Sequence, residues 1–266
     1  MEYQDQLGGF LRPALPAPGF ERAWDLMTSF ESATGIEVRC GVTAVGLIPA
    51  SDSDGGHTLI IRARTGTEYI LARRIVLACG GLEITREQDE VPGTRPAGIM
   101  TPVLAHQLLS LGYLPGRRAV VYGRSRYTNI TALRLVRAGV EVTLVPAPGH
   151  NPPSVAGGIH TEPPAELAEI GGFPRVEWIA LRRDGILLRR QADTLVYASG
   201  LMPNTSWLKG SGVTMTTHRA IAVNERWQTS VPGVYAIGTC VHPSLDHADS
   251  IMLGESAAKV VIRGGS

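Results

Sequence analysis

The sequence contains only three cysteines, Cys40, Cys79 and Cys240, and they lie far apart along the chain. Neither a Cys-x-x-Cys nor a Cys-x4-Cys pair is present, which argues against a thioredoxin-type redox disulfide and against an iron–sulfur knuckle. We therefore expect that the protein is not a disulfide reductase. An odd number of cysteines behind a polar N-terminus is typical of a reducing compartment, which predicts a cytoplasmic location.

Long apolar runs and an excess of one charge are also absent. No hydrophobic run reaches membrane-spanning length, so no membrane insertion is expected. The 25 basic and 24 acidic residues leave a net charge of +1, which implies neither nucleic acid nor an anionic membrane surface as a partner. The 266 residues are 44% hydrophobic and include 31 glycines, which fits one large or two small domains with several tight turns.

Helical and strand periodicities alternate along the chain. The first part predicts a helix over 20–33, a meander of strands over 36–47, 58–63 and 68–71, a buried strand over 73–81, and a helix over 105–111. The middle part predicts a strand–helix–strand unit over 117–145, proline-rich loops over 146–174, and strands over 176–181, 186–188 and 194–198. The last part returns through 220–240 to a final helix over 250–262.

One run near the C-terminus is the most informative part of the sequence. It consists of the turn Val231-Pro232-Gly233, an apolar strand over 234–237, and then Gly238-Thr239. This run resembles the late flavin-binding strand of flavoproteins with two dinucleotide folds. In those proteins a Gly-Asp pair follows the strand and meets the ribityl chain of the flavin.

Three further segments carry the same resemblance: Leu77–Gly81, Pro92–Thr101 and Asn224–Gly233. In order and spacing they are similar to the pyridine nucleotide-disulfide oxidoreductase superfamily. Within it, the chain most resembles the FAD-containing subunits of heteromeric amino-acid and amine dehydrogenases, such as dye-linked proline dehydrogenase, opine oxidase and hydrogen-cyanide synthase. The resemblance implies a component of an FAD-dependent oxidoreductase.

The resemblance also implies an α/β fold made of two nested, Rossmann-like, three-layer dinucleotide-binding folds with small antiparallel β meanders. Residues 1–115 would be the first part of an FAD-like domain, residues 116–200 an NAD(P)-like insert, and residues 201–266 the rest of the FAD-like domain. The residues that the resemblance places at the flavin are Gly8, Gly9, Ala78, Cys79, Gly80, Gly238, Thr239 and, through the backbone N–H groups of the last helix, Ser250 and Ile251.

The sequence departs from the family pattern at both phosphate-binding turns. No Gly-x-Gly-x-x-Gly motif precedes Gly8, so the first turn and its strand–helix unit, which the template puts ahead of Met1, are expected from another chain or from a segment outside this one. Thr239 replaces the usual aspartate, and its hydroxyl can still form a hydrogen bond to the ribityl chain.

The second turn would lie at Gly123-Arg124-Ser125-Arg126. It keeps only the first glycine, because Ser125 and Thr128 stand where the others allow a diphosphate to approach the backbone. Pro146 stands where an acidic residue would bind the ribose, so NAD(P) is not expected here. The two arginines either clasp a phosphate or are solvated on a loop, and the second interpretation is favoured.

Two other groups of residues have simple explanations. The run from His242 to Asp249 gathers two histidines and two aspartates, but it lacks a distant further ligand, so no metal is expected. Capping of the last helix by Asp246 or Asp249 explains the aspartates. A lone buried cysteine such as Cys79 is usually a packing residue.

Three functions follow from these patterns. The first is a flavoprotein component whose missing diphosphate cradle is supplied by another protein subunit or a further segment. The second is a cofactor-free scaffold or assembly subunit derived from such an enzyme. The third is a regulatory module that binds a small anion through Arg124 and Arg126. The first is preferred, and the sequence does not identify its substrate.

Overall fold

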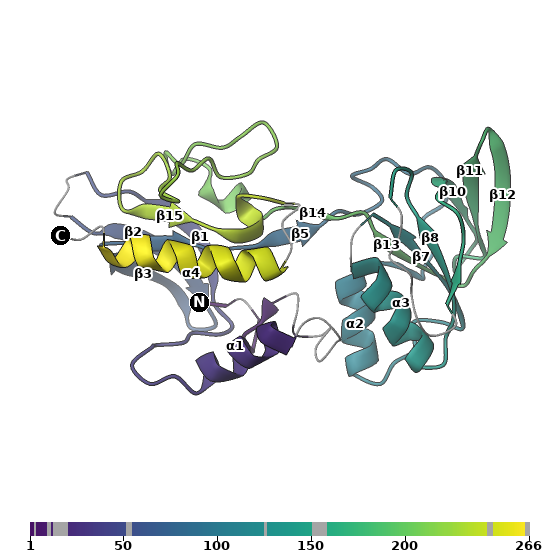
Figure 1. Ribbon diagram of the computed structural model, residues 1–266, viewed down its shortest axis with the longest axis horizontal. Helices are drawn as coiled ribbons and strands as arrows, with labels where there is room; N and C mark the ends of the chain where they lie inside the picture. The colour runs from purple at the N-terminus through teal and green to yellow at the C-terminus, as the bar shows by residue number, and fades with distance from the viewer. Residues whose placement is uncertain are drawn as a thin grey trace. The chain divides into compact units, whose positions relative to one another are not determined.

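The computed structural model describes residues 1–2, 4–9, 12, 21–51, 55–124, 127–150, 159–243 and 247–263. The chain divides into two compact units, whose elements are labelled in Figure 1. The first unit combines the residues up to Leu82 with those from Leu201 onward, and the second consists mainly of Glu83–Gly200. The first unit is therefore discontinuous in sequence.

The first unit contains an antiparallel meander preceded by a helix. These elements are α1 (Glu21–Glu31), β1 (Thr43–Ile48), β2 (His57–Ala63) and β3 (Gly66–Ala72). The strands pair in the order β1-β2-β3, with a bulge in β1 between Ala44 and Gly46. In β2 the alternate residues Leu59 and Ile61 are buried, as expected for a sheet with one face on the core.

Two distant segments of the first unit form a short parallel pair. The elements of this part are β4 (Ile75–Leu77), β5 (Gly81–Glu83), β14 (Leu201–Pro203), η2 (Ser206–Leu208), β15 (Val234–Ala236), η3 (Gly238–Cys240) and α4 (His247–Arg263). β4 pairs with β15 so that Ile75 lies opposite Val234 and Leu77 opposite Ala236. These four side chains are buried in one core with residues of the meander.

The second unit contains a five-stranded parallel sheet, a second meander and two helices. Its elements are β6 (Ile99–Met100), α2 (Pro102–Ser110), β7 (Arg118–Gly123), α3 (Tyr127–Arg137), β8 (Glu141–Pro146), β9 (His160–Thr161), β10 (Glu166–Gly171), β11 (Trp178–Arg183), β12 (Ile186–Gln191) and β13 (Thr194–Ala198). The sheet has the order β6-β13-β7-β8-β9, and the meander has the order β10-β11-β12. Helices α2 and α3 lie on one side of the sheet (Figure 1).

Neighbouring residues in the central strands of this sheet serve two different cores. Val120 and Leu195 belong to the core that the sheet shares with the meander. Val121 and Val196 belong to the core that the sheet shares with α2 and α3. Because both faces are covered, these strands are continuous apolar runs and do not alternate between apolar and polar residues.

Residues 83–115, which the sequence groups with the first part of the chain, pack in the second unit. A Cβ atom on Gly93 would lie 1.9 Å from the carbonyl oxygen of Ile170. The N–H of Thr94 donates to that oxygen at 2.9 Å, and the N–H of Ala97 donates to the oxygen of Pro174 at 2.9 Å. Hydrogen bonds thus join the proline-rich segment to the region of the second meander. Glycine is required at position 93, where this segment approaches β10.

The expected mixture of parallel and antiparallel sheets is confirmed. The expectation of a loop throughout 146–174 is wrong, because β9 and β10 lie there. β10 has the sequence Glu-Leu-Ala-Glu-Ile-Gly, in which Leu167 and Ile170 are buried while Glu166 and Glu169 face outward. The outward glutamates and the preceding prolines obscure the strand pattern in the sequence. Pairing with β11 stabilises β10 in the fold.

Candidate functional site

The predicted flavin residues of the first unit follow β4 and β15. Because these strands are parallel, their carboxyl ends meet at one edge, and the N–H of Ile237 donates to the oxygen of Leu77 at 3.0 Å. After each strand the backbone turns at a glycine in the left-handed region, Gly80 at φ 68° after β4 and Gly238 at φ 77° after β15. This edge brings Ala78, Cys79 and Gly80 together with Gly238 and Thr239.

The geometry of this edge leaves open space beside its glycines. A Cβ atom on Gly80 would lie 3.8 Å from the hydroxyl of Thr239, and one on Gly238 would meet nothing within 4 Å. Asn204 fixes the turn, because its backbone N–H donates to the oxygen of Gly80 at 3.1 Å. Its side-chain Nδ2 donates to the oxygen of Cys79 at 3.3 Å. These two hydrogen bonds anchor the turn, and the space beside Gly238 is open.

The same edge joins two cysteines that the sequence treats as isolated. Cys79 packs against the buried cluster that contains Cys240, and the interaction with Cys240 together with burial raises the pKa of the Cys79 thiol. Cys240 is buried, and its thiol donates to the oxygen of Ile237 at 3.1 Å and to that of Leu77 at 3.4 Å. The two thiols are adjacent although they come from opposite ends of the first unit.

Gly8 and Gly9, which are also expected at the flavin, contact other residues of the first unit. Gly8 packs against α1, where a Cβ atom would lie 2.5 Å from the sulfur of Met27, and Gly9 lies near Glu2. Helix α4 begins at His247, so Ser250 and Ile251 lie near its N-terminal end, and α4 contacts η3, which carries Gly238 and Thr239. Asp246 lies outside the described residues.

In the second unit, Gly123 ends β7 where the nucleotide turn is expected. It lies opposite Ala198 of β13, and a Cβ atom on residue 123 would be 2.1 Å from the oxygen of Ala198. Close packing of two strands is therefore sufficient to require this glycine. Ser125 and Arg126 lie outside the described residues.

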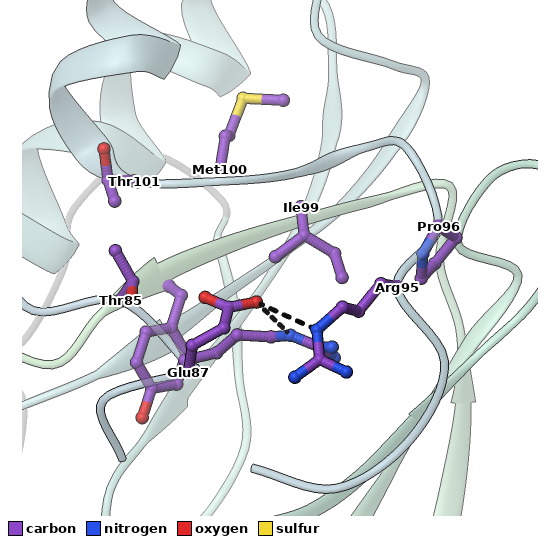
Figure 2. Close-up of a pocket in the computed structure, with 9 residues that line it drawn as sticks. Thr85, Glu87, Arg95, Pro96, Ile99, Met100 and Thr101 are labelled. Atoms are coloured by element: carbon purple, nitrogen blue, oxygen red, sulfur yellow. Dashed lines mark hydrogen bonds and ion pairs between the residues drawn. The ribbon is translucent and has the colours of Figure 1, made fainter. Parts of the chain in front are cut away.

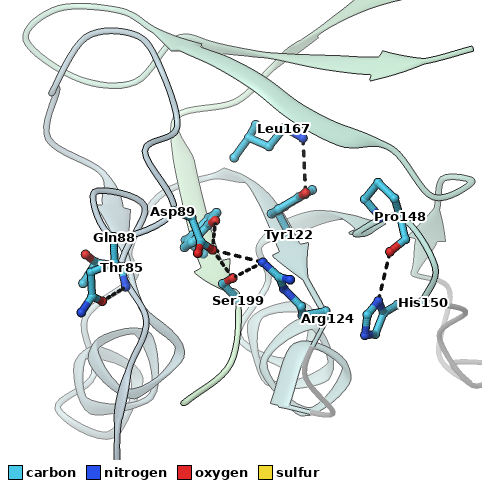
Figure 3. A network of polar contacts seen from close by, with 10 residues as sticks. Thr85, Gln88, Asp89, Tyr122, Arg124, Pro148, His150, Leu167 and Ser199 are labelled. Atoms are coloured by element: carbon cyan, nitrogen blue, oxygen red, sulfur yellow. Dashed lines mark hydrogen bonds and ion pairs between the residues drawn. The ribbon is translucent and has the colours of Figure 1, made fainter. Parts of the chain in front are cut away.

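The side chain of Arg124 is half-exposed, and it also belongs to a polar network at the carboxyl ends of β7 and β13. Its Nη2 donates to the hydroxyl of Ser199 at 3.0 Å and lies 3.3 Å from the carboxylate of Asp89 (Figure 3). Asp89 also accepts hydrogen bonds from Ser199 and from the hydroxyl of Tyr197, the latter at 2.6 Å. Burial and this bond to Asp89 raise the pKa of Tyr197.

Sequence analysis missed this network because its members come from three separated segments without a common spacing. The ring of Tyr197 stacks on that of Tyr122, with their centroids 5.7 Å apart. Asp89 accepts hydrogen bonds from Arg124, Tyr197 and Ser199, all at Oδ2. Nη2 of Arg124 is therefore engaged within the second unit.

A small hollow of about 190 Å³ lies nearby in the second unit. Its lining consists of Thr85, Arg86, Glu87, Arg95, Pro96, Ile99, Met100, Thr101 and Tyr197. The carboxylate of Glu87 accepts a hydrogen bond from Arg86 at 2.9 Å and faces Arg95 at 4.0 Å (Figure 2). The bond from Arg86 lowers the pKa of Glu87. Nη1 of Arg86 has no hydrogen-bond partner among the described residues, and it is shielded from solvent.

No group of three or more His, Cys, Asp or Glu side chains in the described part of the chain could hold a metal ion. Among the helices of the described ranges, none has the length and apolar character needed to cross a membrane.

Comparisons with known proteins relate the chain to redox enzymes. Residues 158–259 match the family described as Pyridine nucleotide-disulphide oxidoreductase. The chain is 27% identical over 208 residues to Nitric oxide reductase FlRd-NAD(+) reductase of Aeromonas hydrophila, which covers 72% of this chain and 52% of that protein. It is 26% identical over 222 residues to Soluble pyridine nucleotide transhydrogenase of Enterobacter sp., which covers 78% and 46%. The chain thus spans about half the length of these relatives.

Solved structures share its fold. Thioredoxin reductase of T. acidophilum superposes with a TM-score of 0.73 at 22% identity, over 92% of this chain and 80% of that one. L-proline dehydrogenase of P. horikoshii superposes with a TM-score of 0.73 at 17% identity, over 99% of this chain and 50% of that one. The chain therefore shares the mixed α/β fold of these two enzymes.

These findings support the predicted relationship to the pyridine nucleotide-disulphide oxidoreductases and correct one exclusion. The expectation that the protein is not a disulfide reductase is contradicted, because its relatives and structural neighbours include disulfide and NAD(P)H oxidoreductases. The exclusion relied on cysteine spacing along the sequence. Spacing does not detect thiols that the fold brings together, as it does Cys79 and Cys240.

Proposed function

We propose that this chain is one component of an FAD-dependent oxidoreductase of the amino-acid or amine dehydrogenase kind, and that its first unit binds the ribityl side of FAD. The observation that carries this proposal is the edge formed by Gly80, Gly238 and Thr239, with open space beside Gly238. The Pro92–Thr101 segment and the likeness in fold to L-proline dehydrogenase motivate the choice of subgroup.

The residues present fit one side of FAD. The hydroxyl of Thr239 would bind the ribityl chain, and the backbone of Gly80 and Gly238 would allow it to approach closely. Bound FAD would provide the acceptor for a hydride from the substrate. The diphosphate has no matching cradle, because the 266 residues contain no Gly-x-Gly-x-x-Gly. In this proposal the cradle comes from residues outside this sequence, in another subunit or a further segment.

The open edge of β4 supports such completion. β4 pairs with β15 on one side and has no second strand partner among the described residues. Its middle residue, Val76, is 44% exposed, although Ile75 and Leu77 on the other face are buried. Parallel strands are normally covered on both faces, and an exposed apolar strand edge is a site for pairing with another strand.

NAD(P) is not assigned to the second unit in this proposal. Gly123 is explained by packing against Ala198, and Pro146 occupies the position of the ribose-binding acid. Arg124 is already paired with Asp89 and Ser199.

The test is flavin binding by the isolated chain, measured by quenching of flavin fluorescence for FAD and for riboflavin. Because the diphosphate cradle lies outside the sequence, we expect weak binding with nearly equal dissociation constants for the two flavins. Thr239→Val should weaken both severalfold, and Thr65→Val, an exposed position in the β2–β3 turn, should weaken neither.

Two outcomes would overturn parts of this proposal. Tight binding of FAD alone, at least a hundredfold better than riboflavin, would show that this chain holds the diphosphate itself. Absence of binding for both flavins, with Thr239→Val indistinguishable from the unmodified chain, would favour the cofactor-free scaffold instead.

A further inference from the structure

A buried arginine in the second unit has a hydrogen-bond donor that the fold does not use. Arg86 follows β5, and its side chain is only 2% exposed. Its Nε donates to the carboxylate of Glu87 at 2.9 Å, but its Nη1 has no hydrogen-bond partner among the described residues. A buried guanidinium N–H without an acceptor costs free energy in the folded state. Because solvent is excluded from Nη1, an acceptor placed there would remove this cost.

Arg86 lines the hollow of about 190 Å³ that Figure 2 shows. All of the lining residues belong to the second unit, so the hollow is a feature of that unit alone. Pockets for drug-sized ligands have volumes of about 300–1,000 Å³. This hollow therefore suits only a small molecule.

The lining combines an excess of positive charge with an apolar wall. Arg86 and Arg95 are opposed by one carboxylate, that of Glu87, which lies 2.9 Å from Nε of Arg86 and 4.0 Å from Nε of Arg95. The bond from Arg86 lowers the pKa of Glu87, so Glu87 is charged at neutral pH. The side chains of the lining thus carry one uncompensated positive charge. The apolar wall consists of β6 (Ile99–Met100) and Pro96.

The beginning of α2 also lies at the hollow, because Thr101 is part of the lining. Two N–H groups of its first turn are already engaged. The N–H of Val103 donates to the carboxylate of Glu83 at 3.0 Å, and that of Ala105 donates to the oxygen of Thr101 at 3.1 Å. The two arginines, and not the helix end, therefore provide the anchor for an anion.

Access to Nη1 requires movement of exposed side chains only. Arg95 and Glu87 are the exposed members of the lining, at 74% and 49%. Exposed ion pairs contribute little to stability, so both side chains can rotate outward at low cost. A ligand that enters between them meets the guanidinium of Arg86.

We propose that this hollow binds a small organic monocarboxylate, whose carboxylate accepts hydrogen bonds from Arg86 and Arg95 and whose apolar part packs on β6. A single carboxylate matches the uncompensated charge, and its two oxygens suit a guanidinium. Inorganic phosphate has no apolar part for β6 to contact. Glu87 competes with the ligand for the same two arginines. The site goes beyond the proposed flavin function and does not depend on it, because it lies within the second unit.

The test uses propionate as the probe and the methyl group of Met100 as the reporter. Met100 is the one methionine in the sequence of the second unit, so a chain isotope-labelled at its methionine methyl groups gives one signal from the hollow, which Met100→Leu identifies. Propionate should shift this signal saturably in nuclear magnetic resonance spectra, with a dissociation constant on the order of 1 mM. The signal of Met215 in the first unit should not move.

Two further probes test what the hollow recognises. Propionamide has nearly the same shape as propionate but no charge, and it should bind at least about tenfold more weakly, because hydrogen bonds to an ionised acceptor are stronger. Inorganic phosphate should also bind more weakly than propionate, because it lacks the apolar part.

Substitutions at exposed positions test the arginines without disturbing the core. Arg95→Gln should weaken propionate binding about threefold, and Glu87→Gln, which removes the competing carboxylate, should strengthen it about threefold. Arg182→Gln, at an exposed arginine of β11, should leave it unchanged. Arg86→Gln should abolish the saturable shift while the circular dichroism of the chain stays unchanged.

Several results would overturn the proposal. Equal dissociation constants for propionate and propionamide, tighter binding of phosphate, or a Met100 shift that does not saturate would each do so. An affinity for propionate that neither Arg95→Gln nor Glu87→Gln changes would also do so. None of these results bears on the first unit, where the fluorescence titration tests flavin binding separately.

Discussion

A buried histidine between α2 and α3 gives a quantitative prediction about the stability of the second unit. His106 is 2% exposed, and its Nδ1 lies 2.9 Å from a guanidinium nitrogen of Arg134. Arg134 can only donate, so Nδ1 is the acceptor, and Nε2–H donates to the hydroxyl of Thr131 at 3.0 Å. That hydroxyl in turn donates to the oxygen of Tyr127 at 2.7 Å. The bond that Nδ1 accepts from Arg134 requires neutral His106, because both nitrogens of a protonated ring are donors.

Protonation of His106 is therefore costly in the folded state. Burial lowers its pKa from 6.5 to about 4, and the charge of Arg134 acts in the same direction. Because the unfolded state binds the proton more readily, the contribution to stability is complete above about pH 6.5 and is lost as the pH falls toward 4. At pH 5 this difference in pKa raises the ratio of unfolded to folded protein about thirtyfold. Protonation of His106 therefore lowers the free energy of unfolding by about 2 kcal/mol between pH 7 and pH 5.

The assay is urea denaturation of the full chain and of His106→Asn at pH 7 and pH 5, followed by circular dichroism. Asparagine retains an acceptor for Arg134 and does not titrate, so it should lose about 1 kcal/mol at pH 7 through the missing bond to Thr131. The loss between pH 7 and pH 5 should then be about 2 kcal/mol smaller in the variant than in the unmodified chain. Equal losses in the two proteins would refute the assignment of a neutral, buried His106.

Two further predictions concern packing and charge in the second unit. Gly123→Ala places a Cβ atom 2.1 Å from the oxygen of Ala198, which is backbone and cannot move aside, so it should cost about 3 kcal/mol of unfolding free energy in urea. Gly139→Ala meets nothing within 4 Å and should cost only about 1 kcal/mol for its positive φ, and similar losses at both sites would contradict the close-packing explanation. Burial alone would raise the pKa of Glu162, but hydrogen bonds from Arg190 and Arg183 outweigh it and lower that pKa. Glu162→Gln should thus lower the melting temperature at pH 7 by an amount equivalent to about 2 kcal/mol, since both arginines are only partly exposed; an unchanged melting temperature would show that these ion pairs add nothing.

Sequence patterns predicted elements whose stability is local or whose burial is uniform. The strand over 194–198 was predicted with the bounds it has, because every residue of β13 is buried and the run after Thr194 is hydrophobic. β10 was missed because it is an outer strand with outward glutamates, and its pairing with β11 stabilises it. The strand expected over 36–47 begins only at Thr43, because residues 39–42 bond instead to Glu2 and Gln4 near the N-terminus.

The residues of the candidate sites also differ in whether the sequence alone could predict them. Gly80, Gly238 and Thr239 could be found from the sequence, because each follows a recognisable apolar strand within one segment. The network of Asp89, Tyr197 and Ser199 with Arg124 could not, because its geometry depends on the pairing of β7 with β13 and on the turn that holds Asp89.

The cysteines show why an absent motif excludes less than it suggests. Cys-x-x-Cys is one way to hold two sulfurs within reach, in which a single turn of the backbone sets their separation. Parallel pairing of β4 with β15 is another, because the carboxyl ends of neighbouring parallel strands lie at one edge whatever the length of chain between them. The same edge carries the glycines proposed for the flavin, so both cysteines lie beside the proposed ribityl-binding turn. A count of spacings tests only the first way, and the error about disulfide chemistry follows from treating it as a test of both.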